Sequence, residues 1–574
     1  MLSYRKLAMR VLSRPLHTGG GIDSPRPASQ RAAAFILTAA MLTTLAAPAF
    51  AATWRIEDGD ITVKAGETEG TNKVSQGTNK DVVDTNTIIT NENKDTASSH
   101  TVTIKTNDKN DTVEVTLKDV NIDTSSRNNA AVSVTGSGNT TIKLDGDNAL
   151  KSDIYRSGIY GSGSGSLTIS GGENDSLTAQ GGSGADGIYS SGSLTISGGT
   201  VTANGGSSGG GDGGDGIWSS GGVTISGGST VTANGGDGKD DYGGDGIRSS
   251  DVTISGGSTV TANGGNGGNV SGDGIRSLDH VAISGGTVTA NGGNSTNSSG
   301  GYGIISLDVA ISSGTVTANG GDSKDGYGGD GIHSNGVTIS GGTVNAAGGY
   351  GGKVGGYGIC SFDRVAISGG TVEAAGGNGS TGGGSGIYSS VIDLSGSLEL
   401  TAKAGSPTGK ALLQNGRELD LDTIKDKLGP GAKVTATDAN GDSKQVSGPR
   451  PVEPEEPVIP EESSSSSDGG SATPSAPVSP LPGLTVTDKD GQRISYTSTQ
   501  SGNTLTVCVG RFTASFRISL AALRQLRAEG IETIAFQTIL CSTTLSVDEL
   551  LAMGSEDAEA VLTHRFTDSS LTVG

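Results

Sequence analysis

Short segments in which apolar and polar residues alternate recur through the middle of the chain. Residues 187–206, GIYSSGSLTISGGTVTANGG, contain three such segments separated by glycine-rich breaks. Alternation with a period of two predicts a β-strand with one buried face, and the glycines predict turns between the strands. This stretch therefore predicts three short strands joined by turns.

The same pattern repeats in nine units of similar length. An isoleucine follows a glycine every 27 to 30 residues, at Ile159, Ile188, Ile217, Ile247, Ile275, Ile304, Ile332, Ile359 and Ile387. A second row runs through Ile169, Ile196, Ile225, Ile254, Ile283, Ile311, Ile339 and Ile367 and ends at Leu394. Three strands cannot enclose a core alone, but stacked identical units bury their apolar faces against one another. We predict an all-β fold, a right-handed parallel β-helix with one coil per repeat over residues 152–404.

Less regular alternation flanks these repeats. Residues 52–151 predict an N-terminal cap and irregular first coils, because the ends of a solenoid need caps against edge-to-edge growth. Residues 405–448 predict a C-terminal cap that includes a short helix from Asp422 to Leu428.

The chain ends in two further parts. Residues 449–483 are rich in proline, glutamate and serine, a composition typical of an extended, disordered linker. Residues 484–574 predict a small α+β domain, in which Ser519 and Ser546 cap two helices.

Composition supports a repetitive fold and argues against a compact enzyme. Glycine occupies 99 of 574 positions and aromatic residues make up only 3%. One large core would need more bulky apolar side chains. The 32% of hydrophobic residues is nevertheless too high for simple disorder, and glycine does not recur at every third position as in collagen.

The first 51 residues resemble a signal peptide. Six basic residues precede an apolar run over residues 32–47, and Ala49-Phe50-Ala51 fits a signal-peptidase site. We expect residues 1–51 to be removed and the protein to be secreted or held at the cell surface. A retained membrane anchor is the alternative.

The charge of the chain narrows the range of expected binding partners, and its cysteine content bears on disulfides. Removing residues 1–51 takes away six basic residues and one acidic residue, so the net charge falls from −21 to about −26. Nucleic acids and anionic membranes need basic surfaces and are not expected partners. Three cysteines are too few for a disulfide framework, and spacing does not show whether Cys508 and Cys541 pair.

One outward row of the predicted coils is acidic. An aspartate precedes Gly-Ile at Asp186, Asp215, Asp245, Asp273 and Asp330. The segments 181–189 and 210–218 also fit the nine-residue calcium turn Gly-Gly-x-Gly-x-Asp-x-U-x. These features predict a calcium site formed by Asp186, Asp212, Asp215, Asp245 and Asp273. The alternative is that each aspartate caps its own turn.

The row that follows each repeated isoleucine carries aromatic and basic residues. It reads Tyr160, Tyr189, Trp218, Arg248, Arg276, Ile305, His333, Cys360 and Tyr388. Aromatic rings stack on sugars, and arginine binds carboxylates with two hydrogen bonds. We therefore predict that Tyr160, Tyr189, Trp218, Arg248 and Arg276 bind a polysaccharide, such as a uronate polymer. A row of strand residues without a ligand is the alternative.

Two other rows have simpler interpretations. Asn204, Asn234, Asn263, Asn291 and Asn319 predict amides that hydrogen-bond along a turn. Five Thr-Val-Thr segments, from Thr200 to Thr317, resemble the faces of ice-binding solenoids. Threonine is also the ordinary solvent-side residue of strands, so we expect this face to be inert towards ice.

Three features together resemble one known family. They are TIKLDGDNALKSD (141–153), GIYGSGSGSLTISGG (158–172) and the repeated DGI-x-S with TISGGT. They look like the secreted carbohydrate-binding β-helix domain of clostridia and their relatives. The resemblance covers residues 110–404 and implies binding of cellulose or acidic sugars, with calcium held in the β-helix.

Two other functions stay open. A cell-surface spacer or adhesin would need no small ligand. A pectate-lyase-like enzyme could use Asp245 with Arg248, or Asp273 with Arg276. Catalysis needs carboxylates with separated pKa values, whereas a repeated ladder offers similar ones. The sequence therefore favours a non-catalytic role.

Overall fold

The computed structural model describes residues 52–449 and, with short gaps, residues 483–573. The gaps are 489–491, 495, 502, 510–512, 539–541, 554–557 and 565–568. The predicted signal peptide, nearly all of the predicted linker, and Cys541 lie outside the described residues. The chain divides into two compact units, Met1–Glu456 and Pro457–Gly574, and each is described by itself.

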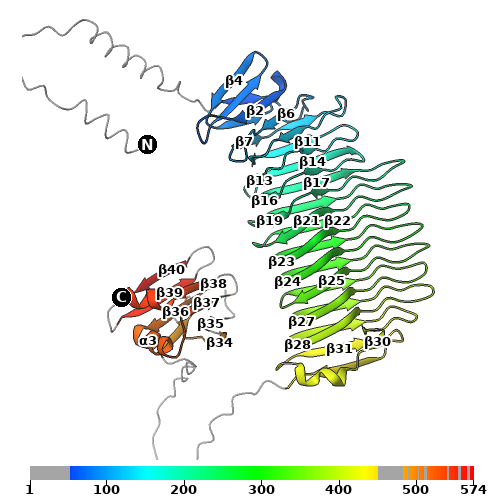
Figure 1. Cartoon of the computed structure of the whole chain (residues 1–574), viewed down its shortest axis with the longest axis vertical. Coiled ribbons are helices and arrows are strands. Elements are labelled where there is room, and N and C mark those ends of the chain that lie inside the picture. The colour runs from blue at the N-terminus through cyan, green and yellow to red at the C-terminus, as the bar shows by residue number, and fades with distance from the viewer. Residues whose placement is uncertain are drawn as a thin grey trace, which may run out of the picture. The chain divides into compact units, whose positions relative to one another are not determined.

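The first unit is a parallel β-solenoid, which confirms the predicted fold (Figure 1). Its strands stack in three columns of parallel strands. The first column has 13 rungs, about 58 Å at 4.8 Å per rung. They are β2 (Ile61–Ala65), β6 (Val102–Lys105), β9 (Val132–Thr135), β12 (Ile159–Gly161), β15 (Ile188–Ser190), β18 (Ile217–Ser219), β21 (Ile247–Ile254), β23 (Ile275–Asn291), β24 (Ile304–Asn319), β25 (Ile332–Ile339), β27 (Ile359–Ala375), β28 (Ile387–Lys403) and β29 (Leu412–Gln414).

The second and third columns complete each coil. The second column contains β1 (Thr53–Arg55), β5 (Thr87–Thr90), β7 (Thr112–Lys118), β10 (Asn139–Asp145), β13 (Leu167–Ser170), β16 (Leu194–Ser197) and β19 (Val223–Ser226). The third contains β8 (Asn121–Asp123), β11 (Asp147–Lys151), β14 (Ser176–Ser183), β17 (Thr200–Gly206), β20 (Thr230–Asn234), β22 (Thr259–Asn263), β26 (Thr343–Ala347) and β31 (Lys433–Thr437). The longer strands β23, β24, β27 and β28 continue from the first column into both others, because backbone pairing persists through the corners, as between Gly370 and Leu398.

The repeated apolar residues form the core, as their spacing predicts. All nine isoleucines of the first row have no exposed surface, and the second row, from Ile169 to Leu394, is at most 1% exposed. Each stacks on its equivalent in the next coil, for example Ile188 on Ile217. The inward alanines of the third column, such as Ala203 and Ala233, are also fully buried and keep the core narrow.

Antiparallel strands close both ends of the solenoid. At the N-terminal end, β2 pairs with β3 (Asn72–Gln76), which pairs with β4 (Asn79–Asp84), beside the 3₁₀ helix η1 (Ile56–Asp58). At the C-terminal end, β29 pairs with β30 (Arg417–Glu418) and β31 with β32 (Ser443–Ser447). The predicted capping helix is the 3₁₀ helix η2 (Leu421–Lys427), whose first turn is capped by the Asp420 carboxylate. These hairpins protect the open strand edges of the stack.

Glycine-rich loops project from one side of the solenoid between the third and first columns (Figure 1). The outgoing and returning arms of successive loops hydrogen-bond in a zigzag: Gly214 N to Gly206 O at 3.0 Å, Gly236 N to Gly214 O at 2.8 Å, and Gly244 N to Gly236 O at 2.9 Å. We call this row, together with the glycines that directly precede its members, the glycine seam. It continues through Gly265, Gly272, Gly293, Gly301, Gly321, Gly329, Gly349, Gly356, Gly377, Gly384 and Gly405.

The seam explains much of the glycine content. A Cβ atom placed on Gly205 would lie 1.9 Å from the carbonyl oxygen of Gly214, and one on Gly213 would lie 1.9 Å from that of Gly236. No side chain fits at such a distance, so each position whose Cβ would meet a carbonyl oxygen this closely requires glycine.

The second unit is the predicted small α+β domain. One sheet has the order β33 (Leu484–Thr487), β36 (Ala514–Ser519), β39 (Glu559–His564), β40 (Ser569–Val573), and the other β34 (Thr497–Ser501), β35 (Thr504–Cys508), β37 (Thr533–Gln537), β38 (Ser542–Ser546). Ser519 caps α3 (Leu520–Ala528) and Ser546 caps α4 (Val547–Ala552), both as predicted. Phe516 and Phe536 pack together in its core, with ring centroids 4.8 Å apart. Among the residues that the structure describes, no helix is long and apolar enough to cross a membrane.

Candidate functional site

The aspartates before Gly-Ile form a buried ladder along the corner between the loops and the first column. Asp215, Asp245 and Asp273 are at most 6% exposed, and Asp186 is largely covered. Each carboxylate accepts a backbone amide of the next coil: Asp186 from Asp215 at 2.8 Å, Asp215 from Asp245 at 2.6 Å, and Asp245 from Asp273 at 2.7 Å. The aspartates therefore link successive coils, an arrangement that differs from an aspartate capping its own turn.

Burial changes the acidity of this ladder. It raises the pKa of Asp186 to about 6, against the opposing effect of the Asp215 amide. The pKa of Asp215 is raised well above its usual value by burial and by the charges of Asp245 and Asp186. The pKa of Asp273 is raised to about 7 by burial and by Asp245. These carboxylates thus lie close enough to repel one another when ionised.

Two arginines balance part of this charge. Arg276 contacts two rungs at once, with Nε 2.9 Å from Asp245 Oδ2 and Nη2 2.5 Å from Asp273 Oδ2. Arg248 lies farther from the ladder, with Nη1 4.0 Å from Asp215 Oδ2.

The structure brings four of the five predicted calcium ligands into one row. Asp212 differs, because it lies exposed in a loop, where its Oδ1 accepts the Tyr242 amide at 3.3 Å. The glycines of the two calcium-turn motifs include Gly213 and Gly214, which the close approach of neighbouring loops requires. That packing accounts for these glycines without a cation.

The predicted carbohydrate-binding residues lie side by side on five successive rungs. Tyr160, Tyr189, Trp218, Arg248 and Arg276 pair in register on β12, β15, β18, β21 and β23. We call these five residues the aromatic–arginine row. Their side chains point away from the core, since the preceding isoleucines point into it.

Members of the row contact one another. The rings of Tyr160 and Tyr189 are stacked, with centroids 5.2 Å apart, and Trp218 meets Tyr189 edge-on at 5.1 Å. Arg248 Cζ lies 5.2 Å from the centroid of the Trp218 ring. One face of the Tyr189 ring therefore lies against Tyr160.

Tyr160 and Arg248 are the most accessible members of the row. Tyr160 is 40% exposed, and its neighbour on the preceding rung is the small Ser133. The Arg248 side chain is 46% exposed, whereas Arg276 is 33% exposed and bound to two aspartates. Tyr160 and Arg248 are thus the members best placed to meet a ligand.

The asparagine and threonine rows follow the third column. Nδ2 of Asn234, Asn263, Asn291 and Asn319 each donates to Oδ1 of the asparagine one coil earlier, at 2.8 Å in every case. This is the predicted amide ladder. The Thr-Val-Thr segments pair in register and their threonines face outward.

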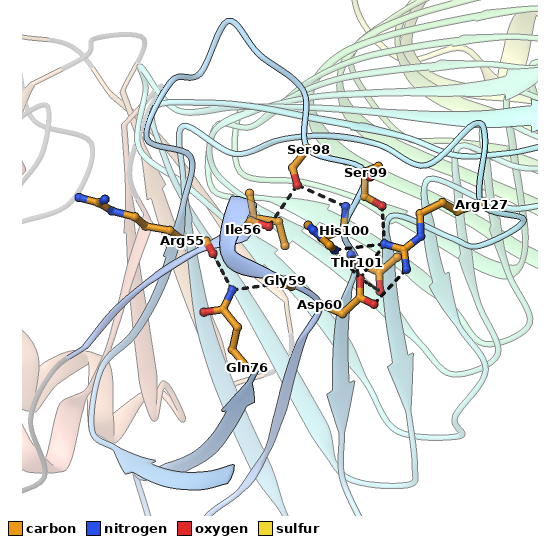
Figure 2. Close-up of polar contacts among 10 residues, drawn as sticks. All are labelled: Arg55, Ile56, Gly59, Asp60, Gln76, Ser98, Ser99, His100, Thr101 and Arg127. Carbon is orange, nitrogen blue, oxygen red and sulfur yellow. Dashed lines mark hydrogen bonds and ion pairs between the residues drawn. The ribbon is translucent and has the colours of Figure 1, made fainter. Parts of the chain in front are cut away.

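The sequence analysis did not single out two polar clusters. Asp330 Oδ2 lies 2.7 Å from His333 Nδ1, with Cys360 on the next rung. At the N-terminal end, Arg127 donates from Nη1 and Nη2 to both oxygens of Asp60, at 3.0 and 3.1 Å (Figure 2). Asp330 and His333 are three residues apart, but Cys360 lies in the next coil, and Asp60 and Arg127 also lie in different coils, so the register of the coils is needed to show that each cluster comes together.

The N-terminal cluster joins three irregular coils. Asp60 also accepts the Thr101 amide at 2.8 Å, and Arg127 contacts His100 Nδ1 at 3.2 Å and the Ser99 carbonyl at 3.0 Å (Figure 2). Partial burial acts to raise the pKa of Asp60, but the Thr101 amide, Arg127 and His100 outweigh it and the pKa is lowered. The cluster therefore joins the N-terminal cap to the first coils through an ion pair and hydrogen bonds.

Comparison of this chain with protein-family models, with curated proteins and with solved structures finds no match.

Proposed function

We propose that this protein is an exported, non-catalytic carbohydrate-binding protein whose solenoid contacts a polysaccharide along the aromatic–arginine row. The observation that carries the proposal is the register of that row. Three aromatic residues and an accessible arginine occupy consecutive rungs in a chain with only 3% aromatic residues. Four steps between five rungs span about 19 Å, room for several sugar units.

The contacts within the row suggest how a glycan would bind. A sugar ring would stack on the free face of Tyr160, and phenol hydroxyls and ring edges would contact sugars farther along. Arg248 would bind a carboxylate of an acidic sugar, since its guanidinium has no close ion pair. Arg276 would contribute less, because Asp245 and Asp273 occupy its guanidinium.

In this proposal, calcium bridges the aspartate ladder and the acidic groups of the polysaccharide. The overall charge repels an acidic polymer, and the aspartate ladder lies beside the row. A cation held by Asp215 and Asp245 would reduce that repulsion and the repulsion within the ladder. Chelation would then lower both glycan affinity and the melting temperature of the solenoid.

Calorimetric titration of the protein with polygalacturonate and with a neutral β-glucan, with and without calcium, tests the proposal. Tyr160→Ala, which removes the free ring face, should weaken binding by roughly 1–3 kcal/mol, as for other aromatic stacking contacts. Arg248→Gln should remove the preference for the acidic polymer. The matched controls are Tyr388→Ala, at the equivalent position of β28 but outside the aromatic–arginine row, and Arg364→Gln, an exposed arginine paired with Asp393.

Equal affinities for Tyr160→Ala and Tyr388→Ala would place any glycan site elsewhere. No binding of either polymer would leave the second candidate, a surface spacer or adhesin. That candidate is favoured by the amide ladder, which satisfies its own hydrogen bonds from coil to coil.

A further inference from the structure

Asp330, His333 and Cys360 meet where two outward rows of the solenoid run side by side. Asp330 continues the row of the aspartate ladder, just before β25. His333 on β25 and Cys360 on β27 are direct partners on adjacent rungs of the neighbouring row. The chain has five histidines and three cysteines in 574 residues, so one of each beside a buried carboxylate is an uncommon combination.

Their donor atoms converge. One oxygen of Asp330, one ring nitrogen of His333 and the Cys360 sulfur all lie within 4.8 Å of one another. Asp330 Oδ2 and His333 Nδ1 are 2.7 Å apart. Ligand atoms of a tetrahedral zinc ion are about 3.4 Å apart, given bonds of about 2.1 Å to nitrogen and oxygen. Small side-chain movements would therefore admit an ion.

The surroundings hold these side chains in place. Asp330 Oδ1 accepts the Tyr357 amide at 2.7 Å, which leaves Oδ2 facing His333. The His333 ring stacks on Tyr302 with centroids 4.4 Å apart and meets Phe362 edge-on at 5.2 Å. These packing contacts fix the orientation of the His333 ring.

The site is also shielded from water. Cys360 is 2% exposed, Asp330 is 6% exposed, and the His333 side chain is 19% exposed. The remaining opening at His333 would let an ion enter.

We propose that Asp330, His333 and Cys360 bind a divalent transition metal ion of the zinc type. A thiolate, an imidazole and a carboxylate are a donor set for zinc, whereas calcium prefers oxygen ligands alone. Binding replaces the bond between thiol sulfur and hydrogen with a sulfur–metal bond and releases the thiol proton to solvent. Three protein ligands leave a fourth position for water or an external ligand. The site is separate from the aromatic–arginine row and does not depend on glycan binding.

Cobalt titration provides a direct test, because a thiolate bound to Co²⁺ gives a charge-transfer absorption band. The full chain, without a histidine tag and under reducing conditions, should carry Cys508→Ser and Cys541→Ser, so that Cys360 is the only thiol. We expect the band to saturate at one Co²⁺ per chain and one equivalent of Zn²⁺ to remove it. Excess Ca²⁺ should leave it unchanged.

Variants of the ligands identify the site. Cys360→Ser should abolish the band, and His333→Gln and Asp330→Asn should each weaken Co²⁺ binding about tenfold or more. The matched control is His280→Gln, since His280 is an exposed histidine near Asp251 and Asp308. Circular dichroism verifies that each variant is folded. If Cys360→Ser is not folded, Cys360→Ala replaces it, because alanine places no hydroxyl in this buried position. Absence of the band in the parent, or its persistence in a folded Cys360 variant, would overturn the proposal.

Discussion

Individual side chains of the aspartate ladder combine a structural role with an electrostatic cost. Each carboxylate accepts an amide from the next coil, yet burial raises the pKa of Asp186 to about 6 and of Asp273 to about 7. An acid whose folded pKa lies above its unfolded value binds more protons in the folded state. Its contribution therefore favours folding at low pH and is lost as the pH rises through the folded pKa.

Asp186→Asn isolates this effect. The amide keeps an oxygen for the Asp215 backbone and removes the charge, so we expect a higher melting temperature than the parent at pH 8. The advantage should shrink between pH 7 and pH 5, where the parent carboxyl becomes protonated. Thermal unfolding in chelator at pH 5, 6, 7 and 8 measures it. A difference that does not vary with pH would contradict the assigned burial effect.

At the residue scale, the sequence predicted which positions point inward and which form rows, but not what each row contacts. The five asparagines from Asn204 to Asn319 form the predicted amide ladder, because a parallel stack places equivalent residues of successive coils side by side. The binding of Arg276 to two aspartates depends on side-chain conformation, which the repeat pattern does not encode.

Among the secondary-structure elements, alternation identified the strands of the regular coils and two serine caps identified α3 and α4. The hairpin strands β3, β4, β30 and β32 have no repeat to mark them, and several are mostly exposed, so alternation is weak there. The glycine seam was not predicted either. Its loops vary in sequence between the glycines, and their close approach appears only when coils are stacked.

Alanine substitutions in a single loop test the seam. Gly213→Ala would place Cβ 1.9 Å from the Gly236 carbonyl oxygen, whereas Gly209→Ala meets nothing within 4 Å. We expect Gly213→Ala to destabilise the solenoid by about 1–3 kcal/mol, as overpacking commonly does, and Gly209→Ala to change stability by less than about 0.5 kcal/mol. Chemical unfolding and protease susceptibility of the loop report the difference. Equal stability of the two variants would mean that the arms do not pack as described.

At the scale of the whole solenoid, each coil pairs only with the coils before and after it. Stability should then be a sum of similar local terms, and length should be adjustable in steps of one coil. The terminal hairpins are different, because they alone cover strand edges.

Deletion of one complete coil tests this modularity. Removing residues 276–304 joins Ile275 to Ile305 and preserves every inward row. We expect this variant to fold, with a melting temperature within a few degrees of the parent. Removing residues 276–289 instead breaks the register of the columns and should abolish cooperative unfolding. Circular dichroism with thermal melts compares the two, and equal behaviour would argue against independent coils.

The amide ladder also gives the solenoid a dipole along its axis. All four side-chain bonds point the same way, so the amide dipoles add along the axis, and each bond polarises the next. The row ends at Asn319. Its neighbour on the next coil is Ala347, and alanine has no side-chain amide to continue the ladder. The Asn204 end therefore carries partial positive charge and the Asn319 end partial negative charge, as the two ends of an α-helix do.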